Sequence, residues 1–199
     1  MKTINQEKEL ALIAGGDMED YAKRKEALDN ISDTRLLKDL AYHAKDEWIR
    51  LESAIACNSL KALKDLVKNS GDEKVKLESA IELNDQITLA ELVIHSKDNT
   101  VRSIALENIT NKKSLIEIIS RGNQPEIKSN AALKLGDKNI IRELAKNIAD
   151  ETYQFKLAQA VYDIELLKKL ENSAKDERIK SLAKDWLENF IFGGKDDID

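Results

Sequence analysis

The sequence predicts an all-α fold in which about seven pairs of short helices follow one another as an α-solenoid. Three observations support this prediction. One pattern returns every 26 residues, and a fixed period of this length is typical of repeat architectures. Apolar residues within each repeat follow helical spacing. The chain of 199 residues contains one proline and seven glycines, whereas an all-β fold needs many more turn residues.

A helix-start residue opens each 26-residue repeat. Asp occupies this position in all but one repeat, and its carboxylate is a preferred N-cap acceptor for the free backbone N–H groups of a helix. The exception, Gln124, is followed by Pro125, and proline in the first helical position is itself a start signal. The seven positions are Asp20, Asp46, Asp72, Asp98, Gln124, Asp150 and Asp176.

The first half of each repeat predicts one helix, which we call helix A. Its fourth, eighth and twelfth positions lie on one helical stripe, as Ile49, Ser53 and Cys57 do in the second repeat. The middle position is small in every repeat except the sixth, where Leu157 is the outlier. A small residue there lets a neighbouring helix approach closely.

The second half of each repeat predicts a second helix, helix B, antiparallel to helix A and also about ten residues long. A leucine-rich stripe, such as Leu37 and Leu40 in the first repeat, marks its buried face. A second column of preferred N-cap residues precedes it. This column contains Asp33, Ser59, Asp85, Asn111, Asp137, Asp163 and Asn189.

The repeats divide the chain into a single domain over residues 1–199. We expect a capping helix in 5–19, with its helical part at 5–14, six full repeats in 20–175, a partial repeat in 176–192 and a frayed acidic tail in 193–199. Lys23 stands where other repeats have Ile or Val, so the first helix A has an alternative start at Asp17. Glycines at predicted helix ends suit left-handed caps, namely Gly71, Gly122 and Gly136.

The openings of helix A, DEWIRLES and DNTVRSIA, resemble HEAT-like repeats of the short type named after phycobilisome lyases. The resemblance implies a right-handed superhelix with the A helices on its convex side and the B helices on its concave side. It also implies a ladder in which the Asp of the first column pairs with the Arg or Lys of the fifth column in a neighbouring repeat. Gln124 and Gln154 interrupt that ladder.

The sequence shows no catalytic constellation, so we expect no enzyme activity, cofactor or metal. His43 and His95 are two repeats apart, about 18 to 20 Å, which is too far to share a metal ion. Cys57 occupies a core column with no histidine placed to activate it. Trp48 lies on a helix A with partial exposure, and Trp186 closes the core near the C-terminal end.

The exposed face of the B helices carries the remaining signal. Positions 16, 19 and 23 of six repeats give eighteen sites, of which nine are basic and one, Glu165, is acidic. The third repeat interrupts this basic stripe with apolar residues, and Ile116 of the fourth repeat adjoins them. The candidate partner-binding residues are Arg35, Lys38, Lys61, Lys64, Lys68, Ile87, Ala90, Ile94, Lys113, Ile116, Arg142 and Lys146.

Two interpretations of this face stay open. It is a groove for an acidic peptide with apolar anchors, or it is a solvated face neutralised by pairs along the helix. Acids at position 20 allow such pairs, each worth a few tenths of a kcal/mol. The pairs are Arg35–Asp39, Lys61–Asp65 and Lys113–Glu117.

These features favour a non-enzymatic adaptor that binds a protein or peptide on its B helices. The alternative is an accessory subunit of a lyase-type or other modifying enzyme. The net charge of −5 and the few aromatic residues argue against nucleic acid as the partner. No apolar run reaches the length of a membrane helix, no secretory signal is visible, and the single cysteine fits a cytoplasmic protein. The oligomeric state stays open.

Overall fold

The computed structural model describes residues 3–17 and 20–193, in which it places fourteen α-helices and no strands. The predicted all-α class is confirmed. The helices are α1 (Ile4–Gly15), α2 (Tyr21–Asp29), α3 (Thr34–His43), α4 (Glu47–Ala56), α5 (Leu60–Asn69), α6 (Glu73–Glu82), α7 (Gln86–His95), α8 (Asn99–Glu107), α9 (Lys112–Arg121), α10 (Pro125–Leu135), α11 (Lys138–Asn147), α12 (Glu151–Val161), α13 (Ile164–Ser173) and α14 (Glu177–Gly193).

The chain divides into two compact units. Unit 1 spans Met1–Thr110 and holds α1 to α8, and unit 2 spans Asn111–Asp199 and holds α9 to α14. The even-numbered helices correspond to helix A of the sequence repeat, and the odd-numbered helices to helix B. Neighbouring helices pack in chain order within each unit, which is consistent with a helical repeat solenoid.

The two cap columns start the helices where the sequence places them, except at Asn189, which lies inside α14. The carboxylate of Asp46 accepts from the backbone N–H of Trp48 at 2.8 Å, and the Ser59 hydroxyl accepts from that of Ala62 at 3.4 Å. Gln124 makes no side-chain cap, and Pro125 begins α10 as expected. Side-chain caps at these positions come from Asp20, Asp33, Asp46, Ser59, Asp72, Asp85, Asp98, Asn111, Asp137, Asp150, Asp163 and Asp176.

The first helices differ in detail from the prediction. The capping helix begins at Ile4, because Thr3 and Gln6 form a reciprocal capping box, and it ends at Gly15. The alternative start of helix A at Asp17 is wrong, since Asp20 caps α2 by accepting from the Lys23 backbone N–H. Residues 18–19 of the predicted capping segment lie outside the described residues.

The C-terminal partial repeat contains one long helix. α14 continues through Asn189, so a second cap there is wrong. Four of the turns between helices A and B use a left-handed residue at position 13, and Glu188 occupies that position in the last repeat. Its carboxylate lies 3.8 Å from Lys184 Nζ, one turn earlier in the same helix. Residues 194–199 of the predicted tail lie outside the described residues.

Left-handed backbone closes four of the turns between helix A and helix B. The residues are Asn58, Asn84, Gly136 and Tyr162, with φ of 51°, 51°, 71° and 55°. The prediction of left-handed caps is thus confirmed for Gly136 and wrong for Gly71 and Gly122. Gly122 serves a close approach, because a Cβ there would lie 2.8 Å from the Ile118 carbonyl oxygen.

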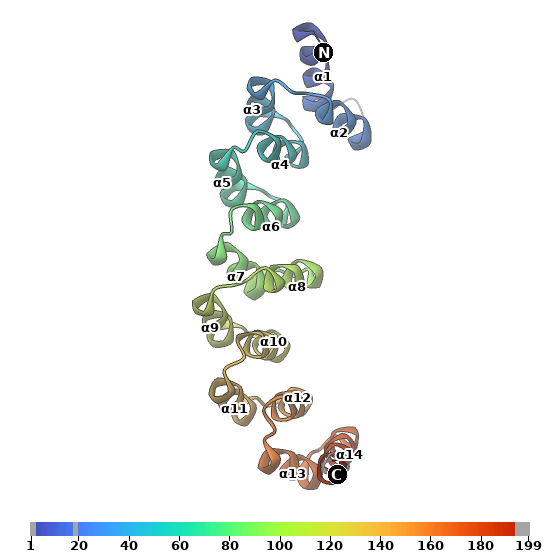
Figure 1. Cartoon of the computed structure of the whole chain (residues 1–199), viewed down its shortest axis with the longest axis vertical. Coiled ribbons are helices and arrows are strands. Elements are labelled where there is room, and N and C mark those ends of the chain that lie inside the picture. The colour runs from blue at the N-terminus through green and yellow to red at the C-terminus, as the bar shows by residue number, and fades with distance from the viewer. Residues whose placement is uncertain (1–2, 18–19, 194–199) are drawn as a thin grey trace, which may run out of the picture. The chain divides into compact units, whose positions relative to one another are not determined.

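In unit 1 each odd-numbered helix packs most extensively on the helix that follows it, so α3 pairs with α4 and α5 with α6. Figure 1 shows α3, α5 and α7 along one side of this unit and α4, α6 and α8 along the other. The small eighth position of helix A is buried here, as predicted, at Ala27, Ser53, Ser79 and Ala105.

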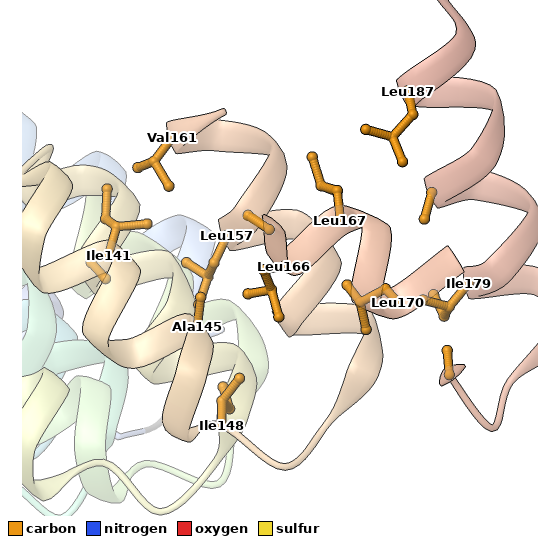
Figure 2. Close-up of a cluster of buried hydrophobic side chains, with 14 residues drawn as sticks. Ile141, Ala145, Ile148, Leu157, Val161, Leu166, Leu167, Leu170, Ile179 and Leu187 are labelled. Atoms are coloured by element: carbon orange, nitrogen blue, oxygen red, sulfur yellow. The ribbon is translucent and has the colours of Figure 1, made fainter. Parts of the chain in front are cut away.

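Unit 2 repeats this arrangement with the pairs α9–α10, α11–α12 and α13–α14. Its core contains the helix B residues Ile141 and Leu167 together with Ile179 of α14 (Figure 2). Leu157, the outlier of the small column, is fully buried in the same cluster. The larger side chain is therefore accommodated in the core.

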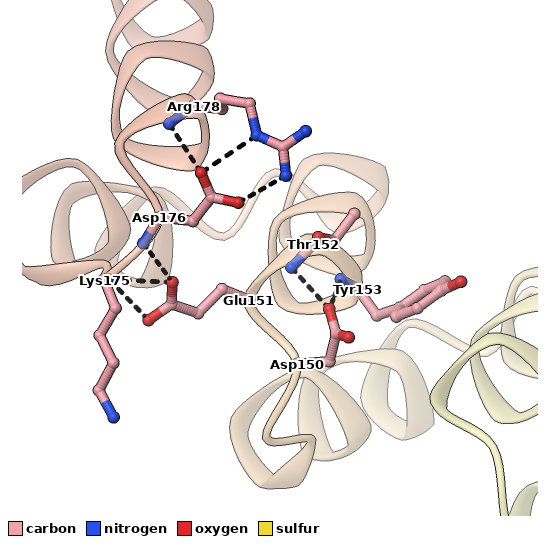
Figure 3. Close-up of polar contacts among 7 residues, drawn as sticks. All are labelled: Asp150, Glu151, Thr152, Tyr153, Lys175, Asp176 and Arg178. Atoms are coloured by element: carbon pink, nitrogen blue, oxygen red, sulfur yellow. Dashed lines mark hydrogen bonds and ion pairs between the residues drawn. The ribbon is translucent and has the colours of Figure 1, made fainter.

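Glutamates at the second position of helix A link consecutive helix pairs. The Glu47 carboxylate accepts from the Ser70 hydroxyl at 2.5 Å and from two backbone N–H groups, and these hydrogen bonds lower its pKa. The Glu151 carboxylate accepts from the backbone N–H groups of Lys175 and Asp176, which likewise lowers its pKa (Figure 3). These bonds join the start of one helix A to the start of the next.

The ladder implied by the HEAT-like resemblance is present at Arg24, whose Nη2 lies 2.7 Å from Asp46 Oδ2. Two other fifth-column side chains, those of Arg50 and Gln154, have different partners. Arg50 binds Asp65 of the following helix B, and Gln154 donates to the Ile148 carbonyl. Asp72 instead accepts from the Trp48 indole at 3.2 Å.

Candidate functional site

The predicted basic residues of unit 1 lie on the exposed faces of α3 and α5. The α5 residues follow one another at helical spacing along a single face. No carboxylate of a described residue lies within 4.0 Å of the ammonium groups on either helix. The exposed lysines are Lys38, Lys61, Lys64 and Lys68.

The expected neutralising pairs are not the ones that form. Asp65 pairs with Arg50 of the preceding helix A, at 2.7 Å, rather than with Lys61. Asp39 lies 4.0 Å from His43, and the side chain of Arg35, which is 94% exposed, lies 3.9 Å from its own N-cap, Asp33. The acids at position 20 of these two repeats thus face other partners, and the lysines of α5 have no carboxylate partner among the described residues.

The apolar interruption of the stripe is only partly on the surface. Ala90 and Ile94 are 1% and 7% exposed, so the prediction that they belong to an exposed binding face is wrong. α7 is apolar on several sides, and a helix of that kind becomes buried on several sides. Ile87, at the start of the same helix, is 72% exposed, so its side chain can contact a binding partner.

An open groove of about 330 Å³ lies beside Ile87, between α5, α6 and α7. Val67 and Leu92 contribute apolar surface to it, and Lys76 and His95 contribute polar groups. This groove was not predicted, because Leu92 belongs to a core column and Lys76 to the ladder column, while the column of Val67 was given no role. The available signal was that Ile87 and His95 both depart from the residues at the same positions in the preceding repeat, Lys61 and Asn69.

In unit 2 the candidate residues lie on α9 and α11. Lys113 and Lys146 are exposed, Arg142 is half-buried, and Ile116 is 49% exposed. No carboxylate of a described residue lies within 4.0 Å of the three cationic groups. The expected partner of Lys113, Glu117, lies 2.6 Å from Arg121 instead.

The two histidines and the cysteine, which were considered as metal ligands or as a nucleophile, each have a partner within their own helix or its end. His43 and His95 are both exposed, each facing an acid four residues earlier. Cys57 is half-buried rather than fully buried, and its Sγ lies 3.8 Å from the Ala54 carbonyl oxygen. Across 3–17 and 20–193, no three His, Cys, Asp or Glu side chains are grouped as a metal site would require.

The two tryptophans lie on A helices. Trp48 is half-buried, in agreement with its predicted partial exposure. Trp186 is partly buried against the core of unit 2 and stacks on Phe190 with ring centroids 5.1 Å apart. Tyr162 approaches both rings, so the side of unit 2 formed by α12 and α14 carries an aromatic cluster.

None of the helices in the described part of the chain is both long enough and apolar enough to cross a membrane. Comparisons with protein-family models, with curated proteins and with solved structures each gave no match.

Proposed function

We propose that the chain is a non-enzymatic binding module, a right-handed superhelix of about seven HEAT-like 26-residue helix pairs that holds a protein segment along its B helices. The unbroken register of the sequence and the order in which the helices pack support this proposal. Repeat arrays of this kind bind through extended surfaces rather than through one deep active site.

The observation that carries the proposal is the segregation of charge on α5. The whole chain has 37 acidic and 32 basic residues, yet the exposed face of this helix presents three lysines that have no acidic partner among the described residues. Like charges held close together on one face repel one another, and an acidic segment relieves that repulsion. Complementary charge of this kind raises association rates and selects partners. The expected partner is therefore an acidic protein segment.

The proposal is tested by reversing the charge of this face. The variant Lys61→Glu/Lys64→Glu/Lys68→Glu should lose most of the proteins that co-purify with the tagged wild-type chain from its own cell extract. The control variant Lys74→Glu/Lys97→Glu/Lys175→Glu changes net charge equally, at three exposed lysines that lie off the B helices. It should retain those proteins.

Nuclease treatment of the extract separates protein binding from bridging by nucleic acid. The proposal is wrong if the two triple variants retain the same partners. It is also wrong if nuclease removes the partners, because a bridging polyanion would then account for the charge dependence.

A further inference from the structure

In two consecutive repeats of unit 1, the residues at positions 5 and 20 form an ion pair in one repeat and not in the next. In one repeat, Arg50 Nη2 lies 2.7 Å from Asp65 Oδ2. The residues 26 positions later are Lys76 and Glu91. Glu91 Oε2 instead lies 3.1 Å from His95 Nε2. Lys76 is half-buried as a whole residue, and no carboxylate of a described residue lies within 4.0 Å of its ammonium group.

Lys76 lies in the wall of the groove of about 330 Å³ between α5, α6 and α7. Val67, Leu92 and the exposed Ile87 form the apolar part of the same groove. A cation beside an apolar surface and without a carboxylate partner among the described residues attracts an incoming anion. The groove thus combines an aliphatic surface with a free position for a carboxylate.

The acidic side chains of the groove are already engaged. Glu73 Oε2 accepts from the Ser96 hydroxyl at 2.6 Å, and Glu91 faces His95. Neither carboxylate is therefore aimed at Lys76. A ligand carboxylate would supply the partner that Asp65 supplies to Arg50 in the preceding repeat.

Lysines extend the positive charge beyond the groove along α5. Lys64 precedes Val67 by three residues, which places it on the same helical face one turn away, and Lys61 lies one turn further. Both are exposed and, within the described residues, without an acidic partner. Charge complementarity therefore selects an acidic ligand segment that runs along α5 from the groove.

The geometry points to this groove as the anchor site for one aliphatic side chain of an acidic partner segment. That side chain packs on Val67 and Ile87, and a neighbouring carboxylate of the segment binds Lys76. Further acids of the segment face Lys64 and Lys61. The inference rests on the proposed function, since it specifies where on the B helices the segment is anchored and by which chemistry.

The test uses the full chain with labelled methyl groups and a synthetic peptide of twelve residues. The peptide carries one central leucine flanked by aspartate and glutamate. The methyl signals of Val67 and Ile87 should shift saturably on titration, with a dissociation constant below about 1 mM. Replacing the leucine by serine, or all the acids by their amides, should weaken binding at least tenfold.

Two variants with matched controls locate the site. Lys76→Gln should weaken peptide binding at least fivefold, whereas Lys74→Gln, on the same helix outside the groove, should leave it unchanged. Ile87→Ser should weaken it similarly, whereas Leu60→Ser should not, although Leu60 is also an exposed aliphatic residue near the start of a B helix. All four sites are accessible enough to change without unfolding the chain, which circular dichroism checks.

The outcomes separate this inference from the broader proposal. The anchor site is wrong if no saturable shift appears at Val67 or Ile87, or if Lys76→Gln and Ile87→Ser bind the peptide as tightly as the wild type. The broader proposal survives that result if Lys61→Glu/Lys64→Glu/Lys68→Glu still loses its cellular partners. If that triple variant keeps its partners while Lys76→Gln weakens peptide binding, the groove stands and the extended lysine face is wrong.

Discussion

The helices α5 and α7 occupy equivalent positions in consecutive sequence repeats and yet present different surfaces. α5 exposes Lys64 and Lys68, and the residues at the same positions of α7 are Ala90 and Ile94, which are buried. Both helices start at an N-cap of the same column and both end after ten residues. The repeat register therefore specifies the backbone, while individual substitutions decide whether a face meets solvent or protein.

The A helices that precede α5 and α7, namely α4 and α6, also differ. Arg50, beside α5, binds Asp65 and also donates to the Ala41 carbonyl. Lys76, beside α7, has no carboxylate partner among the described residues and lines the groove there. The two repeats thus differ in one side-chain pairing.

The largest expected effect comes from giving α7 the residue that α5 carries. Ala90→Lys places a long charged side chain at a position that is 1% exposed, and should reduce the free energy of unfolding by about 3 kcal/mol or more. The reciprocal change Lys64→Ala on α5 should alter it by no more than about 0.5 kcal/mol. Urea unfolding followed by circular dichroism measures both. Equal effects would show that α7 is as exposed as α5.

A smaller effect is expected from the side-chain pairing. Arg50→Met removes an ion pair whose two side chains are 20% and 39% exposed, together with a hydrogen bond to a backbone carbonyl. We expect a loss of about 1 kcal/mol in unfolding free energy. Lys76→Met should change it by no more than about 0.5 kcal/mol, because no ion pair is lost. A cost for Lys76→Met that matches Arg50→Met would indicate that Lys76 and Glu91 pair in solution.

The smallest effect concerns the glutamates that hold the ends of the two helices. Glu47, at the start of α4, accepts from two backbone N–H groups and from the Ser70 hydroxyl just after α5, whereas Glu73, at the start of α6, accepts from the Ser96 hydroxyl just after α7. Folding lowers the pKa of Glu47, so its ionised form stabilises the folded chain above the unfolded pKa of about 4.3. This contribution is lost as the pH falls through the lower folded pKa.

Glu47→Gln should therefore destabilise the chain near neutral pH, and its difference from the wild type should shrink below about pH 4.3. Urea midpoints measured from pH 7 down to acid check this dependence. Glu73→Gln serves as the matched control and should give the smaller effect, since its carboxylate receives fewer hydrogen bonds from the next turn. A difference between wild type and Glu47→Gln that grows toward acid would contradict the assignment.

The sequence predicted the helix boundaries well because the responsible contacts are local. Asp46 and Asp85 cap helices by accepting from backbone N–H groups two or three residues away, so residue type and position suffice. The same reasoning failed at Asn189, where a suitable cap residue lies inside α14. A cap residue favours a helix start but does not create the turn that must precede it.

The candidate surface was predicted less well because exposure depends on neighbours distant in the sequence. Lys61, Lys64 and Lys68 lie on the surface as expected, whereas Ala90 and Ile94 do not. Their column position is the same as that of exposed residues in other repeats. The burial of α7 follows from its apolar character on several sides, which the repeat alignment, taken column by column, did not weigh.

The sequence by itself determined the all-α class, the 26-residue spacing and most helix starts, because N-caps and apolar stripes act over three or four residues. Only the tertiary structure decided which carboxylate each cation binds and which apolar residues stay exposed. These choices depend on side chains from three helices meeting at one place, as Val67, Lys76 and Ile87 do around the groove. The candidate site arises there because Glu91 faces His95 and Lys76 has no carboxylate partner in the part of the chain that the structure describes.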